Sequence, residues 1–308
     1  MTRMKNVIVS GANGFVGSTV VRKLLSRGVN VTALVHSEQK RDFVNSAKLT
    51  VIPFSMDEFG MLPSVLGKKN YDTFYHFAWN GGHAESRNNT TLQLQNVQWT
   101  IDSVRTAKGL GCSRFIGVGT IMEHETHAAA EGQENKPGMG YIYGGAKLAA
   151  HSMAKSVAAD IDIDFVWGML INAYGIGENA PRLINRTIRS IIQGEDLNFS
   201  SAEQNYDFIY IDDAALAFYL LGEKGKPFKN YMIGSGAAGP LKNFLRVIQD
   251  TIAPDKAFNL GAVPFTGIDL PTSVFSIEEL QRDTGFEPKI SFADGVRITY
   301  EWLRSNYG

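Results

Sequence analysis

The chain has 308 residues, of which 44% are hydrophobic and 20% are charged, and its formal net charge is −1. This composition is typical of a folded globular protein, and the length suffices for one large α/β domain or two smaller ones. The charges do not form blocks, which argues against a nucleic-acid-binding surface and against a polybasic membrane anchor. Cys112 is the single cysteine, which excludes an intrachain disulfide and a cysteine-rich zinc site.

Hydropathy gives no sign of a membrane segment. No apolar stretch approaches the roughly 18 residues that a membrane span needs. The first apolar run, Val7-Ile8-Val9, is too short for the core of a signal peptide. We therefore expect a soluble cytosolic protein without a membrane partner.

A glycine-rich turn follows the first predicted strand. Val7–Val9 has no polar alternation, as in a strand covered on both faces, and it leads into Ser10-Gly-Ala-Asn-Gly-Phe-Val-Gly17 and then into a helical pattern. Strand, glycine turn and helix are the context of a dinucleotide-phosphate loop, because the glycines let the backbone approach the pyrophosphate and the helix N-terminus attracts it. The spacing Gly11, Gly14, Gly17 differs from the closer opening of the common fingerprint, and an ordinary tight turn is the alternative.

The second predicted strand, residues 29–35, points to the cofactor type. A carboxylate near its end would bind the adenosine ribose of NAD. Here the strand is followed by His36 and Ser37, and then by Lys40 and Arg41. Donors and cations can accept a 2′-phosphate, so the sequence favours NADP, with NAD as the alternative.

The strands and helices that follow alternate along the chain. This rhythm predicts a Rossmann-type doubly wound parallel sheet, with ligands beyond the carboxyl ends of the strands, where Ala78 and Thr120 lie. Residues 1–170 are predicted to form the dinucleotide-binding domain and residues 171–308 mainly a smaller mixed α/β substrate-binding subdomain, some of whose segments return to the sheet. The predicted strands are 49–54, 73–78, 115–118, 165–171 and 208–211 with one more near Tyr231, and the predicted helices are 91–109, one starting at Pro181, 212–221 capped by Asp212, and 241–252.

Residues 124–140 are polar and contain glycine, so we expect a loop over the site. Glu123, His124 and His127 could suggest a metal-binding site, but no further metal ligand is placed in the sequence to complete it. We expect a solvated loop and no metal.

Tyr143 and Lys147 lie four residues apart at the start of a helical pattern, hence on one face of a helix. A nearby ammonium favours the phenolate, so we expect Lys147 to lower the pKa of Tyr143 and to make it a proton donor and acceptor near neutral pH. The alternative is that an amphipathic helix placed the two residues in register by chance.

Taken together, these motifs resemble the extended short-chain dehydrogenase/reductase family, which contains nucleotide-sugar epimerases, dehydratases and 4-ketoreductases. The resemblance extends over essentially the whole chain. It rests on Gly11–Gly17, Asn96-Val-Gln-Trp-Thr100, Thr120, Tyr143–Lys147, Asn172-Ala-Tyr-Gly175 and Tyr206-Asp-Phe-Ile-Tyr-Ile-Asp-Asp213.

The resemblance implies roles for individual residues. Tyr143 would be the general acid/base, Lys147 would hold the nicotinamide ribose, and Thr120 would hydrogen-bond the reacting oxygen. The cofactor would contact Gly11, Asn13, Gly14, Phe15, Val16, Gly17, His36, Ser37, Phe77, Ala78, Trp79, Asn96, Tyr143, Lys147 and Leu170. The substrate, a nucleotide sugar, would contact Gly81, Ile121, Met122, Asn172, Arg182 and Tyr206.

Three positions depart from the family pattern. Ile121 and Met122 stand where the 4,6-dehydratases carry the Asp-Glu pair that performs elimination, so the sequence argues against dehydration. Tyr206 stands where many relatives carry an arginine for the pyrophosphate, which keeps a non-sugar substrate open. His124 replaces a common tyrosine, with no chemical consequence that we can derive.

These features favour an NADPH-dependent 4-ketoreductase of a 4-keto-6-deoxyhexose nucleotide. The alternatives are a nucleotide-sugar 4-epimerase that retains NAD, a reductase of a non-sugar ketone, and an NADP-sensing regulator without catalysis. The regulator is disfavoured because Thr120, Tyr143 and Lys147 are all present. The resemblance also implies a homodimer formed through the helices 91–109 and 143–159.

Overall fold

A computed structural model describes residues 4–36, 43–67, 70–82, 84–132 and 136–307. Within these residues a seven-stranded parallel sheet has the order β11-β6-β5-β4-β1-β2-β3. Its strands are β1 (Asn6–Ser10), β2 (Asn30–Val35), β3 (Leu49–Pro53), β4 (Thr73–His76), β5 (Arg114–Thr120), β6 (Asp164–Leu170) and β11 (Lys229–Ile233). The order runs outward from β1 in both directions, which confirms the predicted Rossmann-type doubly wound fold.

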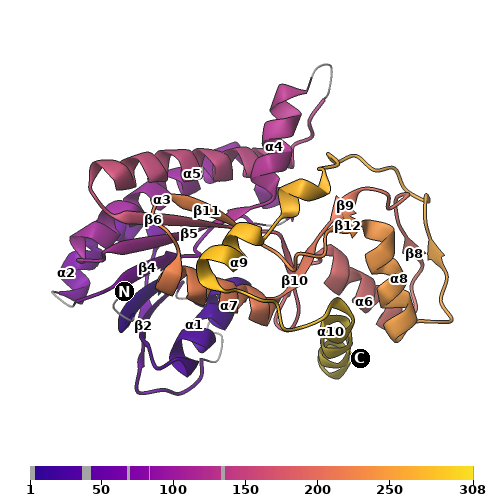
Figure 1. Ribbon diagram of the computed structural model, residues 1–308, viewed down its shortest axis with the longest axis horizontal. Helices are drawn as coiled ribbons and strands as arrows, with labels where there is room; N and C mark the ends of the chain where they lie inside the picture. Colours follow the sequence, from indigo (N-terminus) through magenta and orange to yellow (C-terminus); the bar gives the residue numbers. More distant parts are fainter. Residues whose placement is uncertain (1–3, 37–42, 68–69, 83, 133–135, 308) are drawn as a thin grey trace.

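Helices cover both faces of this sheet (Figure 1). One layer contains α3 (Thr90–Gly109) and α5 (Tyr141–Asp160), and the other contains α1 (Phe15–Ser26) and α7 (Ile211–Lys224). The side chains of β1 alternate between the two layers: Val7 and Val9 pack with the α1 and α7 side, whereas Ile8 packs with the α3 and α5 side. All three are fully buried, as expected of a strand covered on both faces.

The remaining elements gather beyond the carboxyl ends of the sheet strands, at the right of Figure 1. Helices α6 (Leu183–Gln193) and α8 (Leu241–Ile252) both pack on α10 (Phe292–Tyr307). Short strands pair beside them as β10 with β7, β12 with β9 and β13 with β8. Their bounds are β7 (Asn172–Tyr174), β8 (Leu197–Asn198), β9 (Asn205–Tyr206), β10 (Phe208–Tyr210), β12 (Gly239–Pro240) and β13 (Phe258–Asn259). Two segments of this half, α7 and β11, return to the sheet.

The smaller elements lie between these units. On the amino side they are η1 (Met56–Met61), α2 (Leu62–Leu66) and η2 (Ala84–Asn88), and on the carboxyl side η3 (Thr272–Phe275) and α9 (Glu278–Thr284). Helix α9 packs on α7 and β11. No helix in the described part of the chain is both long enough and apolar enough to cross a bilayer.

The expected loop at 124–140 is wrong in its first part, because α4 (Met122–Glu131) is a helix that packs on α5. The close approach depends on Gly144, where a Cβ atom would lie 2.6 Å from the Met122 carbonyl oxygen. The polar composition was misleading because Glu123, in the first turn of α4, is buried in a hydrogen-bond network rather than solvated.

Two helix starts also differ from the prediction. Helix α6 begins at Leu183 rather than at Pro181, because Arg182 is the extended N-cap residue. Helix α7 begins at Ile211 with Tyr210 at its N-cap, so Asp212 lies in the first turn and is not the cap. The negative charge of its carboxylate still interacts favourably with the positive end of the helix dipole.

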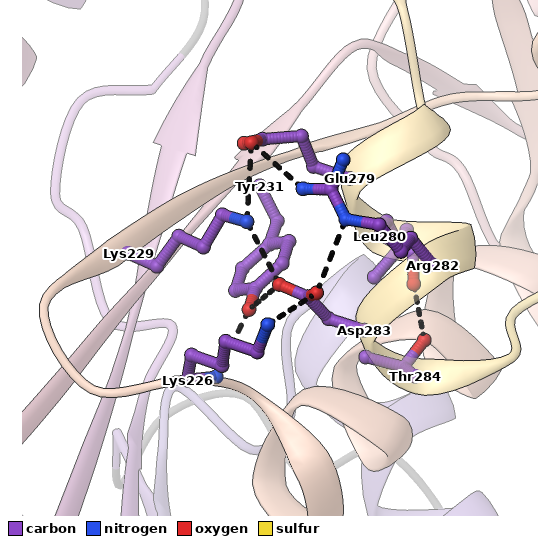
Figure 2. Close-up of polar contacts among 8 residues, drawn as sticks. All are labelled: Lys226, Lys229, Tyr231, Glu279, Leu280, Arg282, Asp283 and Thr284. Atoms are coloured by element: carbon purple, nitrogen blue, oxygen red, sulfur yellow. Dashed lines mark hydrogen bonds and ion pairs between the residues drawn. The ribbon is translucent and has the colours of Figure 1, made fainter.

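A cluster of charged side chains fastens α9 to β11 (Figure 2). The buried carboxylate of Asp283 lies 2.8 Å from the ammonium groups of Lys226 and Lys229. The Tyr231 hydroxyl donates a hydrogen bond of 2.9 Å to the same carboxylate. Lys229 also pairs with Glu279, one turn earlier on α9. These contacts lower the pKa of Asp283, with the hydrogen bond from Lys226 as the largest cause.

Candidate active site

The glycine turn brings β1, β4 and the start of α1 into close contact. Gly11 has φ +66°, and a Cβ atom there would lie 2.5 Å from the backbone nitrogen of Ala78. A Cβ atom on Gly17 would collide with the Gly11 carbonyl oxygen. Helix α1 begins after Gly14, and no side chain caps its N-terminus. The turn therefore offers free N–H groups and a positive dipole end at the carboxyl edge of the sheet, which fits the pyrophosphate of a dinucleotide.

The other predicted cofactor residues of the first half differ in their exposure to solvent. Asn13 and Leu170 are buried, and Phe15, Val16 and Phe77 are partly buried against the core. His36 is exposed directly after β2. Ser37, Lys40 and Arg41, on which the preference for NADP depends, lie outside the described residues.

Asn96 and Gln93 on α3 hold the chain after β4. The Asn96 side chain accepts a hydrogen bond from the Asn80 N–H and donates one to the Asn80 carbonyl, both of 2.8 Å. Gln93 accepts a hydrogen bond of 2.9 Å from the Trp79 indole. Asn96 therefore acts on the predicted cofactor pocket by fixing the backbone beside Trp79.

Lys147 is 3% exposed, and its ammonium contacts a backbone carbonyl and an indole ring. Its ammonium donates a hydrogen bond of 2.9 Å to the Val118 carbonyl and lies 3.7 Å from the centroid of the Trp79 ring. It lies 6.0 Å from the centroid of the Tyr143 ring. Burial lowers the pKa of Lys147 to about 7, which reduces its positive charge at neutral pH.

The expected lowering of the Tyr143 pKa by Lys147 is wrong. Burial raises the pKa of Tyr143, and the cations that oppose this effect are Arg87 and Arg182. A hydrogen bond between the hydroxyls of Thr120 and Tyr143 also lowers it. Desolvation of the phenolate is the largest of these effects.

Arg87, in η2, is a site residue that the sequence reasoning missed. Its guanidinium carbon lies 4.1 Å from the centroid of the Tyr143 ring, and the group makes a hydrogen-bond interaction with the Tyr143 hydroxyl. Burial lowers the pKa of Arg87. An isolated arginine in an irregular stretch carries no periodic signal, so only the fold reveals its position.

A buried carboxylate positions Thr120 at the end of β5. The Glu123 Oε1 atom accepts hydrogen bonds from the Thr120 N–H (2.9 Å) and from the Trp167 indole (3.1 Å). Its Oε2 atom lies 2.9 Å from His151 Nδ1, and His151 Nε2 lies 2.9 Å from the Asn230 side-chain oxygen. The network ties the Thr120 backbone to β6, α5 and β11.

The predicted catalytic and substrate residues converge on one cavity of about 370 Å³ between the sheet and the C-terminal elements. Seven of them line it: Thr120, Ile121, Met122, Tyr143, Asn172, Arg182 and Tyr206. Gly81 does not line it, but its neighbour Gly82 does. Lys147 is not among the residues that line the cavity.

Three of the lining side chains are held by neighbours. Asn172 donates a hydrogen bond of 3.2 Å to the Asp207 carbonyl. Arg182 pairs with Glu178 at 3.2 Å. The Tyr206 ring stacks on Phe208 at 5.6 Å, in the position where many relatives carry an arginine.

Glu125, on α4, is the second residue that the sequence reasoning missed, because the segment was expected to be a loop. It is the only carboxylate that lines the cavity within the described residues. Burial raises its pKa to about 7, and the charge of Arg87 opposes this shift. The carboxyl group is therefore partly protonated near neutral pH.

Comparisons with known proteins find relatives that are similar over nearly the whole chain. The CDP-abequose synthase of Salmonella typhimurium is 25% identical over 304 residues, which cover 96% of this chain and 98% of that protein. The dTDP-4-dehydro-6-deoxy-D-allose reductase of Streptomyces bikiniensis is 25% identical over 323 residues, which cover 97% and 96%. Both relatives are thus similar over nearly their whole length.

A solved structure shares the fold. The UDP-glucose 4-epimerase of Thermotoga maritima, determined with UDP-glucose, superposes with a TM-score of 0.80 at 21% identity and covers 98% of this chain and 100% of its own. Residues 7–234 match the model of the NAD dependent epimerase/dehydratase family. The resemblance found in the sequence is therefore confirmed, and the chain belongs to the NAD dependent epimerase/dehydratase family.

Proposed function

We propose that the protein is an NADPH-dependent 4-ketoreductase of a 4-keto-6-deoxyhexose nucleotide. The observation that carries the proposal is the meeting of Tyr143 and Thr120 on the wall of one cavity, which the predicted substrate residues Asn172, Arg182 and Tyr206 also line. The names of the two relatives, a CDP-sugar synthase and a dTDP-4-dehydro-sugar reductase, support a nucleotide sugar as the substrate.

Each residue has a defined task in this proposal. A bound nicotinamide supplies the hydride, and the glycine turn, Asn96 and Lys147 would hold the cofactor. Tyr143 donates the proton to the carbonyl oxygen, and Thr120 hydrogen-bonds that oxygen. Asn172, Arg182 and Tyr206 would contact the sugar nucleotide along the cavity wall.

NADP is proposed over NAD because His36, and not a carboxylate, is the residue that directly follows β2. The second candidate is a 4-epimerase that retains NAD, which the structural similarity to a UDP-glucose 4-epimerase favours. The two candidates differ in what the protein does with its cofactor. A reductase consumes and releases NADPH, whereas an epimerase keeps NAD through the reaction.

The test begins with the purified protein. Any bound nucleotide is released by denaturation and identified, and NADPH and NADH are then titrated by fluorescence. A reductase is expected to bind NADPH more tightly and to oxidise it with a CDP- or dTDP-linked 4-keto-6-deoxyhexose. Firmly retained NAD without a preference for NADPH supports the epimerase.

Tyr143→Phe tests the acid/base assignment. The variant should bind NADPH as the wild type does and lose turnover by roughly 10²- to 10⁴-fold, the usual contribution of a positioned proton donor. Tyr141→Phe, two residues earlier on the same helix and outside the cavity lining, is the matched control and should keep turnover. Unchanged turnover in Tyr143→Phe contradicts the assignment.

We also propose a homodimer formed through α3 and α5. Leu94 on α3 and Met153 on α5 are exposed apolar side chains, at 66% and 51% of their surface. A second copy would cover them. Light scattering after size-exclusion chromatography should give twice the chain mass for the wild type and the single mass for Leu94→Glu.

A further inference from the structure

We propose that Glu125 is a specificity-determining residue, which accepts a hydrogen bond from a ring hydroxyl of the sugar. The inference rests on the proposed function and deepens it, because it says which groups of the substrate the cavity recognises. It assigns a ligand to a side chain of α4 that belongs to none of the sequence motifs.

Glu125 lies where two hollows of the structure meet. It lines the cavity of about 370 Å³ that Tyr143 also lines. It lines in addition a smaller hollow of about 30 Å³, which is large enough for one water molecule. Ile121, Asn172 and Tyr206 line both hollows as well. The carboxyl group of Glu125 therefore borders the space that a ligand in the larger cavity would occupy.

The side chains around Glu125 leave its carboxyl group without a hydrogen-bond partner among the described residues. Arg87, Tyr141 and Tyr206 interact with it through charge alone. Asn172, an amide that lines both hollows, donates its side-chain hydrogen bond to a backbone carbonyl instead. Removing a carboxyl group from water costs free energy unless a hydrogen bond replaces the lost hydration. The site therefore favours a ligand that brings a donor to Glu125.

The chemistry of a 4-keto-6-deoxyhexose nucleotide limits the choice of this donor. C1 carries the diphosphate, C4 carries the carbonyl oxygen that Tyr143 and Thr120 would contact, C5 is bonded to the ring oxygen, and C6 is a methyl group. The hydroxyls on C2 and C3 are therefore the only hydrogen-bond donors of the sugar. Glu125 binds one of these two hydroxyls.

A hydroxyl suits Glu125 in both of its protonation states. Burial raises the pKa of Glu125 to about 7, so the ionised and the protonated forms are both present near neutral pH. The ionised form accepts at both oxygens, and the protonated form still accepts at its carbonyl oxygen. The contact is therefore available on either side of that pKa.

Helix α4 holds Glu125 in place before a ligand binds. The Glu125 N–H donates a hydrogen bond of 3.3 Å to the Ile121 carbonyl at the start of the helix. Helix α4 lies so close to α5 that a Cβ atom on Gly144 would collide with the Met122 carbonyl and the Thr126 hydroxyl. Glu125 lies between these two contact points, so its backbone is fixed by the packing of the two helices. A side chain on a fixed backbone loses less freedom on binding.

The experiment measures binding to the full-length protein by isothermal titration calorimetry in the presence of NADPH. The ligands are the CDP- and dTDP-linked forms of 6-deoxyglucose and of its C4 epimer, which NADPH cannot reduce because C4 already carries a hydroxyl. Each is compared with its 2-deoxy and 3-deoxy derivatives and with free CDP and dTDP. Glu125→Ala removes the acceptor, Glu125→Gln keeps an amide oxygen, and Glu131→Ala removes an exposed carboxylate at the end of α4 as the matched control.

The wild type is expected to bind the hydroxylated sugar about ten- to a hundredfold more tightly than one of its two deoxy derivatives, as is usual for a hydrogen bond to a charged group. Glu125→Ala should bind that derivative and the hydroxylated sugar equally. Glu125→Gln should keep part of the difference, because its oxygen still accepts. Glu131→Ala should behave as the wild type does, and the free nucleotides should bind alike to all four proteins.

A difference between the sugars that persists in Glu125→Ala overturns the inference, as does a wild type that binds all of the sugars equally. An equal loss of affinity for the sugars and for the free nucleotides in Glu125→Ala also overturns it, because Glu125 would then only support the fold. A wild type that binds none of the nucleotide sugars contradicts the proposed function itself, and the inference with it. The two failures are thus distinguished by the wild type alone.

Discussion

Replacing Glu123 by leucine should remove a large part of the stability of the fold. The carboxylate is 3% exposed and accepts hydrogen bonds from the Thr120 N–H, the Trp167 indole and the His151 ring. Leucine has a similar size but accepts none of them. Three buried donors would therefore lose their partner at once.

The magnitude follows from these three contacts. A buried polar group without a partner costs about 1–3 kcal/mol, so Glu123→Leu should lose about 3–9 kcal/mol. The free energy of unfolding of a typical domain is only about 5–15 kcal/mol. Glu123→Gln should lose only about 1–2 kcal/mol, because its oxygen can still accept from Thr120 and Trp167 while its NH₂ group donates to a neutral His151.

The assay is guanidinium-induced unfolding followed by tryptophan fluorescence. Glu131→Leu is the matched control, since this exposed residue at the end of α4 makes a single ion-pair contact, of 3.4 Å, with His127. Its free energy of unfolding should stay within about 0.5 kcal/mol of the wild type. A Glu123→Leu variant within about 1 kcal/mol of the wild type would refute the reasoning. It would mean that the three donors find water or other partners.

Three further predictions concern other parts of the molecule. Asp283→Asn should lower the unfolding free energy at pH 7 by about 2 kcal/mol. Because the pKa of Asp283 is depressed in the folded protein, its stabilisation is present above the unfolded pKa near 4 and is lost as the pH falls. The unfolding curves of the wild type and the variant should therefore converge in acid. The free energy of unfolding of the wild type should fall as the pH rises from about 5 to 7, because the raised pKa of Glu125 lets the folded protein hold a proton that the unfolded chain has released. Glu125→Gln should remove this fall, and parallel pH profiles of stability for the variant and the wild type would contradict the prediction. Gly17→Ala should weaken NADPH binding in fluorescence titrations at least tenfold, since its Cβ meets the Gly11 carbonyl, whereas Gly60→Ala, with no atom within 4 Å of the new carbon, should bind as the wild type does.

The sheet could be predicted because its strands are short apolar runs between glycine turns and amphipathic helices. Val7–Val9 is an example: a strand covered on both faces contains no polar residue, so it stands out in the sequence as a continuous apolar run. Helix α4 was missed for the opposite reason. Glu123 and His124 resemble loop residues in a one-dimensional pattern, yet Glu123 is buried, since partners from β6 and α5 satisfy its carboxylate.

The candidate site was predictable where its residues belong to motifs and unpredictable where they depend on loop geometry. Thr120, Tyr143 and Asn172 stand in recognisable stretches, and the fold brings them to one cavity. Arg87 reaches the same cavity through hydrogen bonds between Gln93 and a turn that has no regular pattern. The spacing of Tyr143 and Lys147 was read correctly as one helix face, but burial, which a sequence does not display, reverses the expected pKa effect.

The groups in the cavity that can carry protons bear on which reaction of the family this chain performs. Ketone reduction needs one proton at the reacting oxygen, and in the proposed mechanism Tyr143, which is hydrogen-bonded to Thr120, would give it. Elimination of water needs a further base and a further acid at adjacent carbons. Ile121 and Met122 cannot act as either, and Glu125 is the only carboxyl group that lines the described cavity. Because Glu125 is a single carboxyl group and lies one turn of α4 beyond those two positions, we propose reduction or epimerisation, rather than dehydration, as the reaction of this chain.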